Sequence, residues 1–466
     1  MSLVVYNTKT RNKEEFKPIN EGRVGMYVCG PTVYGNPHLG HAKSYITFDV
    51  IYRYLMYLGY KVKYVQNITD VGHIVGDADA GEDKIGRQAV KENLDPYEIA
   101  YKYELAYFDG MEKMNVLKPS ISARATGHII EMIEMIETLI EKGYAYVTAE
   151  GNVYYSVKKF KDYGKLSNRT LDETVSGERI EISEDKESPE DFALWKKADA
   201  THLMRWPSPW SVGYPGWHIE CSVMSKKYLG KTFDIHGGGM DNIFPHHECE
   251  TAQSEAANGC TFVNYFIHNN LVTINGQKMG KSLGNSFALG DLFKEYNPIL
   301  IRFYILQNHY RRPTDFTKEG LDSLKDTFNK LSETVNNMRN ELKNVNREYT
   351  KDSEIEELKH SFIEAMNDDF NTGLAITYIY EASKLINKEL TGNKDINKLL
   401  NLDNFIKECA EDILGLKFEN TSSNKEKELL EIIKNIRKKY REEKNYLESD
   451  KLRDELKEIG ITISDR

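Results

Sequence analysis

The pattern of apolar and polar positions near the N-terminus predicts a strand, a turn and a helix in succession. Residues 23–28 alternate and are rich in β-forming side chains, so we expect a strand that ends at Cys29. Beyond residue 41, apolar side chains recur at helical spacing until Gly59, at Ile46, Val50, Ile51, Tyr54, Leu55 and Leu58. The segment between is rich in glycine and proline. Because a helix N-terminus points free N–H groups and a positive dipole end into such a turn, the pattern predicts a phosphate-binding site.

A second strand is predicted over residues 61–70, where an apolar run ends in polar side chains. In doubly wound folds, ligands bind at such ends of parallel strands. We therefore expect Thr69 and Asp70 to face the same pocket as Cys29, although an ordinary passage from strand to loop would look the same.

The character of the chain changes after about residue 110. Apolar residues at helical spacing predict an amphipathic helix over 128–142, and short strands are expected at 144–147 and 152–156. The charged run 181–191 is typical of a solvated loop. We interpret this block as an insertion between two halves of one nucleotide-binding fold.

The second half of that fold carries a glycine run, Gly237 to Gly239, followed by Asp241. Glycines let a ligand pack against bare backbone, and a following acid suits ribose hydroxyls. We therefore expect Gly238 and Asp241 to contact a nucleotide.

The rest of the chain is predicted to be helical, with long polar helices over 318–345, 352–368 and 371–388. Further on, Leu429, Ile432, Ile433, Ile436 and Tyr440 form an apolar stripe surrounded by lysine and arginine. Such a charged helix is usually a solvated face, but it could also contact nucleic acid.

Composition limits the classes of protein that the chain can belong to. Its 466 residues are enough for two to four domains, and 40% apolar with 29% charged residues is typical of a globular protein. The net charge of −10 argues against indiscriminate binding of polyanions. We find no run long enough to span a membrane and no signal peptide, and five scattered cysteines predict no disulfide framework. We therefore expect a cytoplasmic protein.

Four residues offer ligands that tetrahedral Zn²⁺ accepts. Cys29 and Cys221 supply thiolates, His246 an imidazole and Glu250 a carboxylate. His246 and Glu250 are spaced so that a helix would place them on one face. Spacing alone leaves a second interpretation open, in which the thiols are merely buried. We expect Cys260 and Cys409 to be buried thiols without a further role.

Two histidines stand at the start of the first predicted helix, His38 and His41, with Gly40 between them. Imidazoles one helical turn apart can both donate to the charge that develops on a triphosphate. Alone, the pair could equally be surface or helix-capping residues. Further along, Lys278 and Lys281 lie on a glycine-flanked loop that can close over a triphosphate.

These motifs together resemble a known family. The His-Leu-Gly-His segment with its Pro-Thr-x-Tyr-Gly-x-Pro lead-in resembles the HIGH signature of class I aminoacyl-tRNA synthetases, and Lys278 to Ser282 resembles KMSKS, with Gly280 in place of the usual serine. Cys-Gly-Pro-Thr-Val-Tyr, Pro-Gly-Trp-His-Ile-Glu-Cys-Ser, His-Gly-Gly-Gly-x-Asp and Phe-Pro-His-His-Glu resemble the cysteinyl-tRNA synthetase family over essentially the whole chain.

The resemblance implies roles for individual residues. It implies zinc at Cys29, Cys221, His246 and Glu250, with the neighbouring His247, Glu248 and Cys249 outside the ligand set, and catalysis by His38, His41, Lys278 and Lys281. It implies ATP contacts at His38, Gly40, His41, Gly238, Asp241, Lys278, Lys281 and Ser282. It implies substrate cysteine contacts at Cys29, Thr69, Trp217 and His236. It implies tRNA contacts at Arg441, Tyr446, where the family usually has tryptophan, Asp450 and Asp465.

The implied activity is the formation of cysteinyl-adenylate from L-cysteine and MgATP, followed by transfer to tRNA(Cys). One zinc ion per chain would select the thiolate, which it binds far better than the serine hydroxyl. We expect a monomer. Two alternatives stay open: a ligase that joins activated cysteine to an amino-sugar amine, and a catalytically silent nucleic-acid-binding protein with structural zinc.

The expected fold is α/β, a Rossmann-type doubly wound parallel sheet split by an insertion and followed by an all-α C-terminal region. The predicted division is 1–110 for the first half of the catalytic domain, 111–205 for the insertion, 206–285 for the second half, 286–345 for a helical junction domain, 346–415 for an anticodon-binding bundle and 416–466 for an anticodon-recognition segment.

Overall fold

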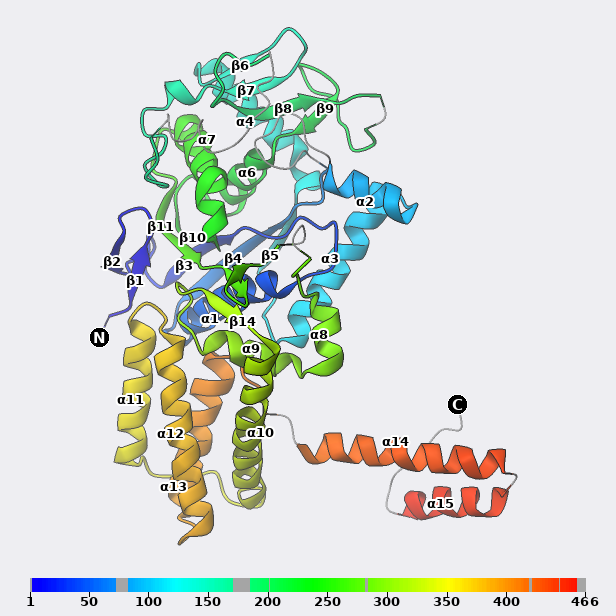
Figure 1. The fold of residues 1–466 in the computed structure, drawn as a ribbon. Helices are drawn as coiled ribbons and strands as arrows, with labels where there is room; N and C mark the ends of the chain where they lie inside the picture. The colour runs from blue at the N-terminus through cyan, green and yellow to red at the C-terminus, as the bar shows by residue number, and fades with distance from the viewer. Residues whose placement is uncertain are drawn as a thin grey trace.

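The computed structural model describes residues 2–72, 83–170, 185–200, 202–280, 284–418, 421–443 and 445–458. A five-stranded parallel sheet lies at its centre, with the insertion on one side and the helical region on the other (Figure 1). The strand order is β11 (Val263–Asn269), β10 (Phe233–Gly239), β3 (Arg23–Val28), β4 (Lys61–Ile68) and β5 (Ile121–Arg124). The prediction of a Rossmann-type sheet is thus confirmed.

Helices cover both faces of this sheet, and the alternation along β3 decides which side chains meet them. Val24, Met26 and Val28 belong to the core that contains α1 (Leu39–Tyr57). Tyr27 and Cys29 belong to the opposite core, with α4 (Ile129–Glu141), α6 (Trp217–Leu229) and α7 (Glu248–Asn258). Successive side chains of a strand point to opposite faces, so Cys29 is directed towards α6 and α7.

The insertion forms its own antiparallel sheet of β6 (Ala145–Val147), β7 (Val153–Tyr155), β8 (Phe192–Lys197) and β9 (Gly213–Pro215). Two predicted boundaries need correction. β5 falls in the range predicted for the insertion, yet it pairs with β4, with Val65 opposite Ile121. β9 falls in the range predicted for the second half, yet it pairs with β8. Both strands are too short for their periodicity to reveal a partner, because pairing depends on distant residues.

Between β4 and β5, α2 (Lys84–Glu92) and α3 (Pro96–Lys113) connect the two strands, while β1 (Val4–Asn7) and β2 (Asn12–Glu15) form an N-terminal hairpin. After β11, a small sheet contains β12 (Val272–Ile274), β13 (Gln277–Lys278) and β14 (Thr314–Phe316). This sheet carries the lysine-containing loop.

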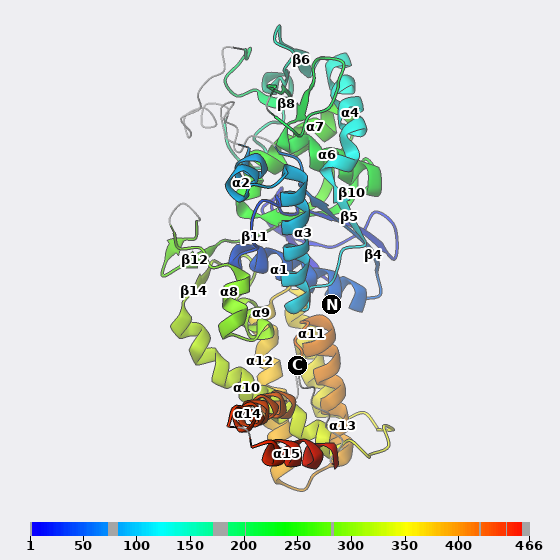
Figure 2. The ribbon, with the colours of Figure 1, turned by 90° about the vertical axis from the view of Figure 1, so that its right-hand side faces the viewer.

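The remaining described chain is helical. α8 (Leu289–Glu295) and α9 (Pro298–Leu306) lie below the sheet and lead to a bundle of α10 (Lys318–Glu341), α11 (Ser353–Asn367), α12 (Thr372–Thr391) and α13 (Ile396–Phe405), continued by the π-helix Ile406–Ile413. α14 (Thr421–Glu442) and α15 (Tyr446–Glu458) form a hairpin that is set apart from the bundle to the right in Figure 1 and lies in front of it in Figure 2. None of the described helices combines the length and apolar character that a membrane crossing requires.

Candidate active site and metal centre

The turn after β3 is built around a close backbone approach. The Gly30 amide donates to Asn67 Oδ1 at 2.7 Å, and a Cβ on Gly30 would lie 1.6 Å from the Asn67 carbonyl oxygen. Only glycine fits this position. The amide of Cys29 donates to the carbonyl of Gly237 at 3.0 Å, so the turn is held between the ends of β4 and β10.

His38 and His41 form the N-terminal cap of α1. His38 Nδ1 accepts from the Gly40 amide at 3.2 Å, and His41 Nδ1 accepts from the His38 amide at 3.1 Å. The rings stack with centroids 3.8 Å apart. Because both Nδ1 atoms accept, the proton of each neutral ring is assigned to Nε2, which can donate. The capping interpretation is therefore confirmed, with Nδ1 of each ring as the capping acceptor.

The loop after β13 lies against this helix terminus. Lys278 Nζ is 3.1 Å from Asp241 Oδ1, which brings together two predicted nucleotide-binding residues. Asn285 holds the loop, because its side chain accepts from the Gly280 amide at 2.8 Å and donates to the Lys278 carbonyl at 3.2 Å. A Cβ on Gly40 would lie 3.0 Å from Met279 Cε. Lys281 and Ser282 lie outside the described residues.

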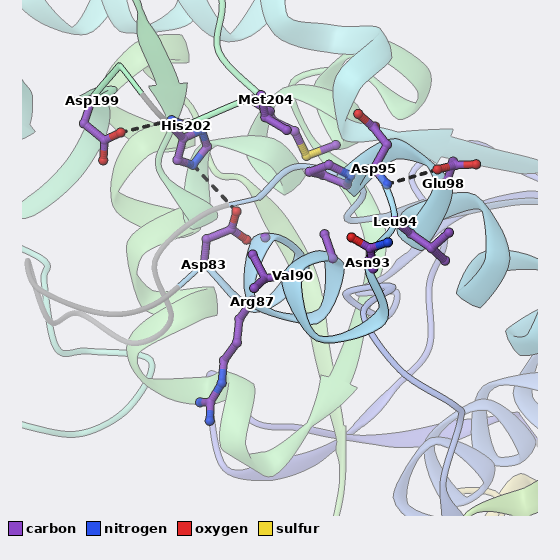
Figure 3. Close-up of a pocket in the computed structure, with 14 residues that line it drawn as sticks. Asp83, Arg87, Val90, Asn93, Leu94, Asp95, Glu98, Asp199, His202 and Met204 are labelled. Carbon is purple, nitrogen blue, oxygen red and sulfur yellow. Dashed lines mark hydrogen bonds and ion pairs between the residues drawn. The ribbon is translucent and has the colours of Figure 1, made fainter.

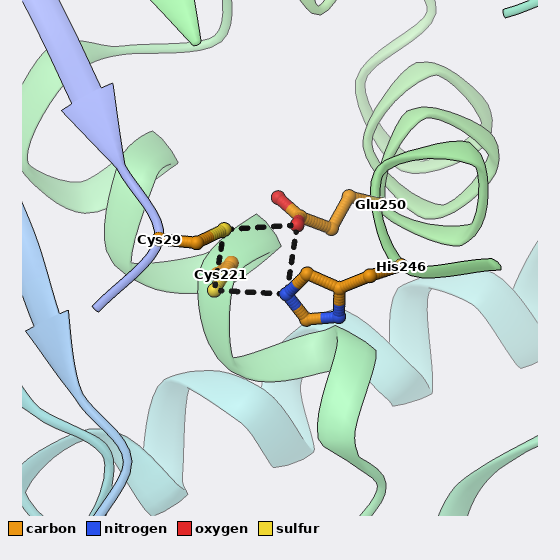
Figure 4. A group of neighbouring side chains, drawn as sticks. All are labelled: Cys29, Cys221, His246 and Glu250. Atoms are coloured by element: carbon orange, nitrogen blue, oxygen red, sulfur yellow. Dashed lines mark hydrogen bonds and ion pairs between the residues drawn. The ribbon is translucent and has the colours of Figure 1, made fainter. Parts of the chain in front are cut away.

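The four predicted zinc ligands converge from four segments of the chain. Figure 4 shows Cys29 after β3, Cys221 on α6, His246 just before α7 and Glu250 on α7. All four are buried. Their atoms are separated by 3.8 Å for Cys29 Sγ to Cys221 Sγ, 3.6 Å for Cys221 Sγ to His246 Nε2, 3.1 Å for His246 Nε2 to Glu250 Oε1 and 3.7 Å for Cys29 Sγ to Glu250 Oε1.

These separations fit the edges of a tetrahedron around one ion. With Zn–S bonds of about 2.3 Å, two thiolates in tetrahedral coordination lie about 3.8 Å apart, and shorter bonds to nitrogen and oxygen give shorter edges. Burial raises the pKa of Cys29 well above its usual value and also raises the pKa of Cys221. Cation binding must therefore displace two thiol protons.

A ring of histidines surrounds this cluster. His218 Nδ1 lies 2.8 Å from His246 Nδ1, and His236 Nε2 lies 2.8 Å from Glu250 Oε2. His247 Nε2 lies 3.2 Å from Cys29 Sγ. A second set, Cys29, His236, His247 and Glu250, also has ligand atoms within 4.8 Å of one another. It shares two residues with the first set but contributes only one thiolate, so the first set matches the ligand preference of zinc better.

Two of the surrounding histidines, His218 and His268, are not among the residues predicted from the sequence, whereas His236 is predicted as a substrate contact. His247 was placed outside the ligand set, yet it contacts Cys29 on one side and His268 on the other, where His247 Nδ1 and His268 Nε2 lie 2.8 Å apart. Glu248 and Cys249 do point elsewhere, towards Ser167 and Tyr163. The motif letters carried no signal for this difference, because it arises from the direction of successive side chains at the start of α7.

The predicted substrate contacts lie around the cluster. The Trp217 ring stacks on His246 with centroids 4.3 Å apart, and Thr69 Oγ1 donates to the buried Glu220 carboxylate at 2.7 Å. Asp70 is also buried, and its carboxylate is held by Thr126. Its carboxylate accepts from the amide and hydroxyl of Thr126 at 2.9 and 2.5 Å, because β5 places that turn beside the end of β4.

The thiols outside the cluster differ from one another. Cys409 is buried, as predicted, but Cys260 is exposed, which corrects that expectation. Cys260 follows Gly259, whose left-handed backbone (φ 69°) ends α7 and starts a surface turn.

Three of the four predicted tRNA-binding residues lie on the α14–α15 hairpin. Arg441 Nε donates to Ser449 Oγ at 3.3 Å, and Asp450 Oδ1 pairs with Arg453 at 3.1 Å. Tyr446 begins α15 and is 59% exposed, so its ring is accessible for stacking. Asp465 lies outside the described residues.

A separate cavity of about 890 Å³ lies where Asp199 and residues 202–204 meet α2 and α3 (Figure 3). Two of its acidic side chains cap helix N-termini. Asp83 accepts from the Ile85 amide at the start of α2, and Asp95 accepts from the Tyr97 amide at the start of α3. None of the predicted site residues lines this cavity, and we assign it no role in the site.

Comparison with known proteins places the chain in a family. Residues 15–326 match the tRNA synthetases class I (C) catalytic domain, and residues 361–419 match the DALR domain. The Mycobacterium tuberculosis methionyl-tRNA synthetase in complex with methionyl-adenylate has a similar fold, with a TM-score of 0.60 at 13% identity over 84% of this chain and 89% of that chain. The fold and the matched catalytic domain thus define a class I tRNA synthetase.

The particular family follows from curated relatives. The cysteine–tRNA ligase of Chlorobium chlorochromatii is 48% identical over 100% of this chain and 98% of its own length. That of Bacteroides fragilis is 48% identical over 99% and 97%, and that of Thermus thermophilus 46% identical over 100% and 98%. The chain belongs to the cysteine–tRNA ligase family.

Proposed function

We propose that the chain activates L-cysteine with ATP and transfers the cysteinyl group to tRNA(Cys). The observation that carries this proposal is the position of Cys29. It is one vertex of the buried thiol, imidazole and carboxylate cluster, and it also begins the turn that leads to the helix cap of His38 and His41. A site for a soft side chain and a site for phosphates therefore share one turn.

The adenylation step requires positioning and charge stabilisation more than proton transfer. The substrate carboxylate is itself the nucleophile towards the α-phosphate, so no general base is needed. His38 and His41 would donate from Nε2 to phosphate oxygens at the α1 N-terminus, and Lys278 and Lys281 would neutralise the departing pyrophosphate with Mg²⁺. Gly238 and Asp241 would contact the nucleoside, and Ser282 a phosphate.

Cys29, Cys221, His246 and Glu250 would hold one zinc ion, since their separations fit tetrahedral coordination. When bound, zinc would supply a soft Lewis acid that prefers the thiolate of cysteine to the hydroxyl of serine. Trp217 would pack beside the substrate side chain, Thr69 would be oriented by Glu220, and His236 would hold Glu250 in place.

The helical region would bind the tRNA, with Arg441, Tyr446, Asp450 and Asp465 contacting the anticodon. The family match over the whole chain, with a DALR domain at 361–419, supports tRNA over an amino sugar as the acceptor. We expect the enzyme to act as a monomer in the cytoplasm.

The test is cysteine-dependent ATP–pyrophosphate exchange by the purified full chain, with serine as the control amino acid and zinc counted in the same sample. We expect exchange with cysteine only, about one zinc per chain, and charging of tRNA(Cys). If the chain shows exchange and ligates cysteine to an amino sugar but does not charge tRNA, the assignment of tRNA(Cys) as the acceptor is wrong. Absence of exchange in a folded, zinc-loaded sample would overturn the proposal as a whole.

A further inference from the structure

Lys43 is a buried lysine close to the proposed ATP site. It belongs neither to the His38–His41 motif nor to the Lys278–Ser282 motif. It follows His41 by two positions on α1 and is 1% exposed. Its Nζ donates to the carbonyls of Arg312 at 2.6 Å and Leu271 at 3.3 Å, and to the hydroxyl of Thr314 at 2.9 Å. Three ammonium protons therefore meet three neutral acceptors.

One of these acceptors lies in the small sheet that carries the lysine loop, and the other two lie just before its strands β12 and β14. Leu271 directly precedes β12, and Thr314 begins β14, which pairs with β12 in parallel. β12 continues through a turn into β13, which ends at Lys278, and the Met279 amide donates to the Val272 carbonyl at 3.3 Å. Lys43 thus connects the helix of His38 and His41 to the base of the loop of Lys278.

The far end of the same loop is also attached to α1, but through the backbone. The Leu39 amide donates to the Phe287 carbonyl at 3.1 Å, and the Leu289 amide donates to the Pro37 carbonyl at 2.9 Å. The segment that carries the lysine loop is therefore held to α1 at both ends. At one end the Lys43 side chain makes the hydrogen bonds, and at the other end the main chain makes them.

Burying this ammonium is costly. No ion pair joins Lys43 to a carboxylate among the described residues, and burial lowers its pKa to about 7. An unbranched apolar side chain would fill the same space without this cost. When it is protonated, the Lys43 amine donates three directed hydrogen bonds, which fix its orientation in a way that apolar packing does not.

We propose that Lys43 is a positioning residue for the adenylation reaction. It holds the loop that carries Lys278 in a fixed position relative to His38 and His41. The inference rests on the proposed function, because it assigns Lys278 and the two histidines to ATP. Lys43 itself touches no reacting group.

The test compares Lys43→Met with the unchanged full chain in ATP–pyrophosphate exchange. We expect kcat to fall and the KM for ATP to rise, together lowering kcat/KM for ATP by about tenfold to a hundredfold, because small misplacements of reacting groups have effects of this size. The KM for cysteine and the zinc content should not change, since the cluster lies on the opposite face of β3.

Two further variants separate positioning from stability. Thr314→Val removes one acceptor while keeping the shape, and its effect on the KM for ATP should add little to that of Lys43→Met in the double variant. Lys142→Met is the control, because Lys142 Nζ also bonds main-chain carbonyls, of Ala257 at 2.6 Å and Ala256 at 3.4 Å, but far from α1. It should leave the KM for ATP unchanged.

A KM for ATP and a kcat within twofold of the unchanged chain for Lys43→Met would overturn the inference. A loss of kcat that only follows the unfolded fraction in circular dichroism, with both KM values unchanged, would also overturn it. If the unchanged chain itself shows no exchange, the proposed function fails first, so the two failures are distinguishable.

Discussion

The Sγ atoms of Cys29 and Cys221 lie 3.8 Å apart, although 192 positions separate the two residues in the chain. One thiol ends a central strand and the other lies on the helix that packs over it. The four-residue cluster of Cys29, Cys221, His246 and Glu250 forms only when these distant segments meet, so it reports on correct folding of the split catalytic domain.

Replacing Cys221 should remove both metal and selectivity. In Cys221→Ala we expect zinc to fall to near zero, and the preference for cysteine over serine in exchange to fall by about a hundredfold or more, because the soft ligand site is lost. Metal analysis and exchange with both amino acids measure this. Cys409→Ala, at a buried thiol in the helical region, should keep zinc and preference. A Cys221 variant with full zinc and normal preference would contradict the assignment.

His218 should tune metal affinity without being a ligand. Its Nδ1 lies 2.8 Å from Nδ1 of His246, so it fixes the tautomer that directs His246 Nε2 to the cluster. We expect His218→Leu to weaken zinc binding by about 10- to 100-fold in competition with a chelator. The matched control is His128→Leu, at another buried histidine with two hydrogen bonds, which should keep wild-type affinity. An equal loss of zinc affinity in His218→Leu and His128→Leu would mean that the effect is general destabilisation of the fold.

His268 should make the fold sensitive to acid. Burial, with a smaller contribution from His236, lowers the pKa of His268 to about 3. In the unfolded chain a histidine titrates near pH 6.5, so between about pH 6.5 and 3 the unfolded state binds a proton that the folded state does not. Stability is therefore lost as the pH falls through this window, by at most about 1.4 kcal/mol per pH unit.

The corresponding variant is His268→Gln, which does not titrate in this window. Urea unfolding at several pH values between 4 and 7 should show a shallower dependence of the free energy of unfolding on pH than in the unchanged chain. His360→Gln, at a histidine whose side chain is 68% exposed, should keep the original slope. An unchanged slope in His268→Gln would show that other groups control acid sensitivity.

Tyr446 should contribute to tRNA charging but not to adenylation. Stacking of a base on an aromatic ring is worth about 1–3 kcal/mol, so Tyr446→Ala should lower kcat/KM for tRNA by about tenfold or more while exchange is unchanged. Tyr446→Phe keeps the ring and should keep most of the charging activity. Tyr349→Ala, at another exposed tyrosine, is the control. Normal charging by Tyr446→Ala would remove this residue from the predicted interface.

Much of the fold could be predicted because the local periodicity of apolar residues indicates strands and helices. The alternation of residues 23–28 and the helical spacing after residue 41 correspond to β3 and α1, and the amphipathic stretch 128–142 corresponds to α4. The four predicted zinc ligands are scattered along the chain, and their assignment as a set came from motif resemblance, since no spacing joins Cys29 to α6 and α7. The short strand β5 was assigned to the wrong domain, because its pairing partner β4 is distant in the chain and the local pattern does not indicate it.

The sequence by itself determined the class of fold, the signature turn and helix, and the chemical identity of the candidate ligands, because side-chain type and short-range period are properties of neighbouring residues. Only the tertiary structure decided which side chains meet. It turned Asp70 towards Thr126, exposed Cys260, set His247 against Cys29 and joined Lys43 to the base of the lysine loop. These contacts depend on strand order and on the packing of helices across the sheet, which relate residues far apart in the chain.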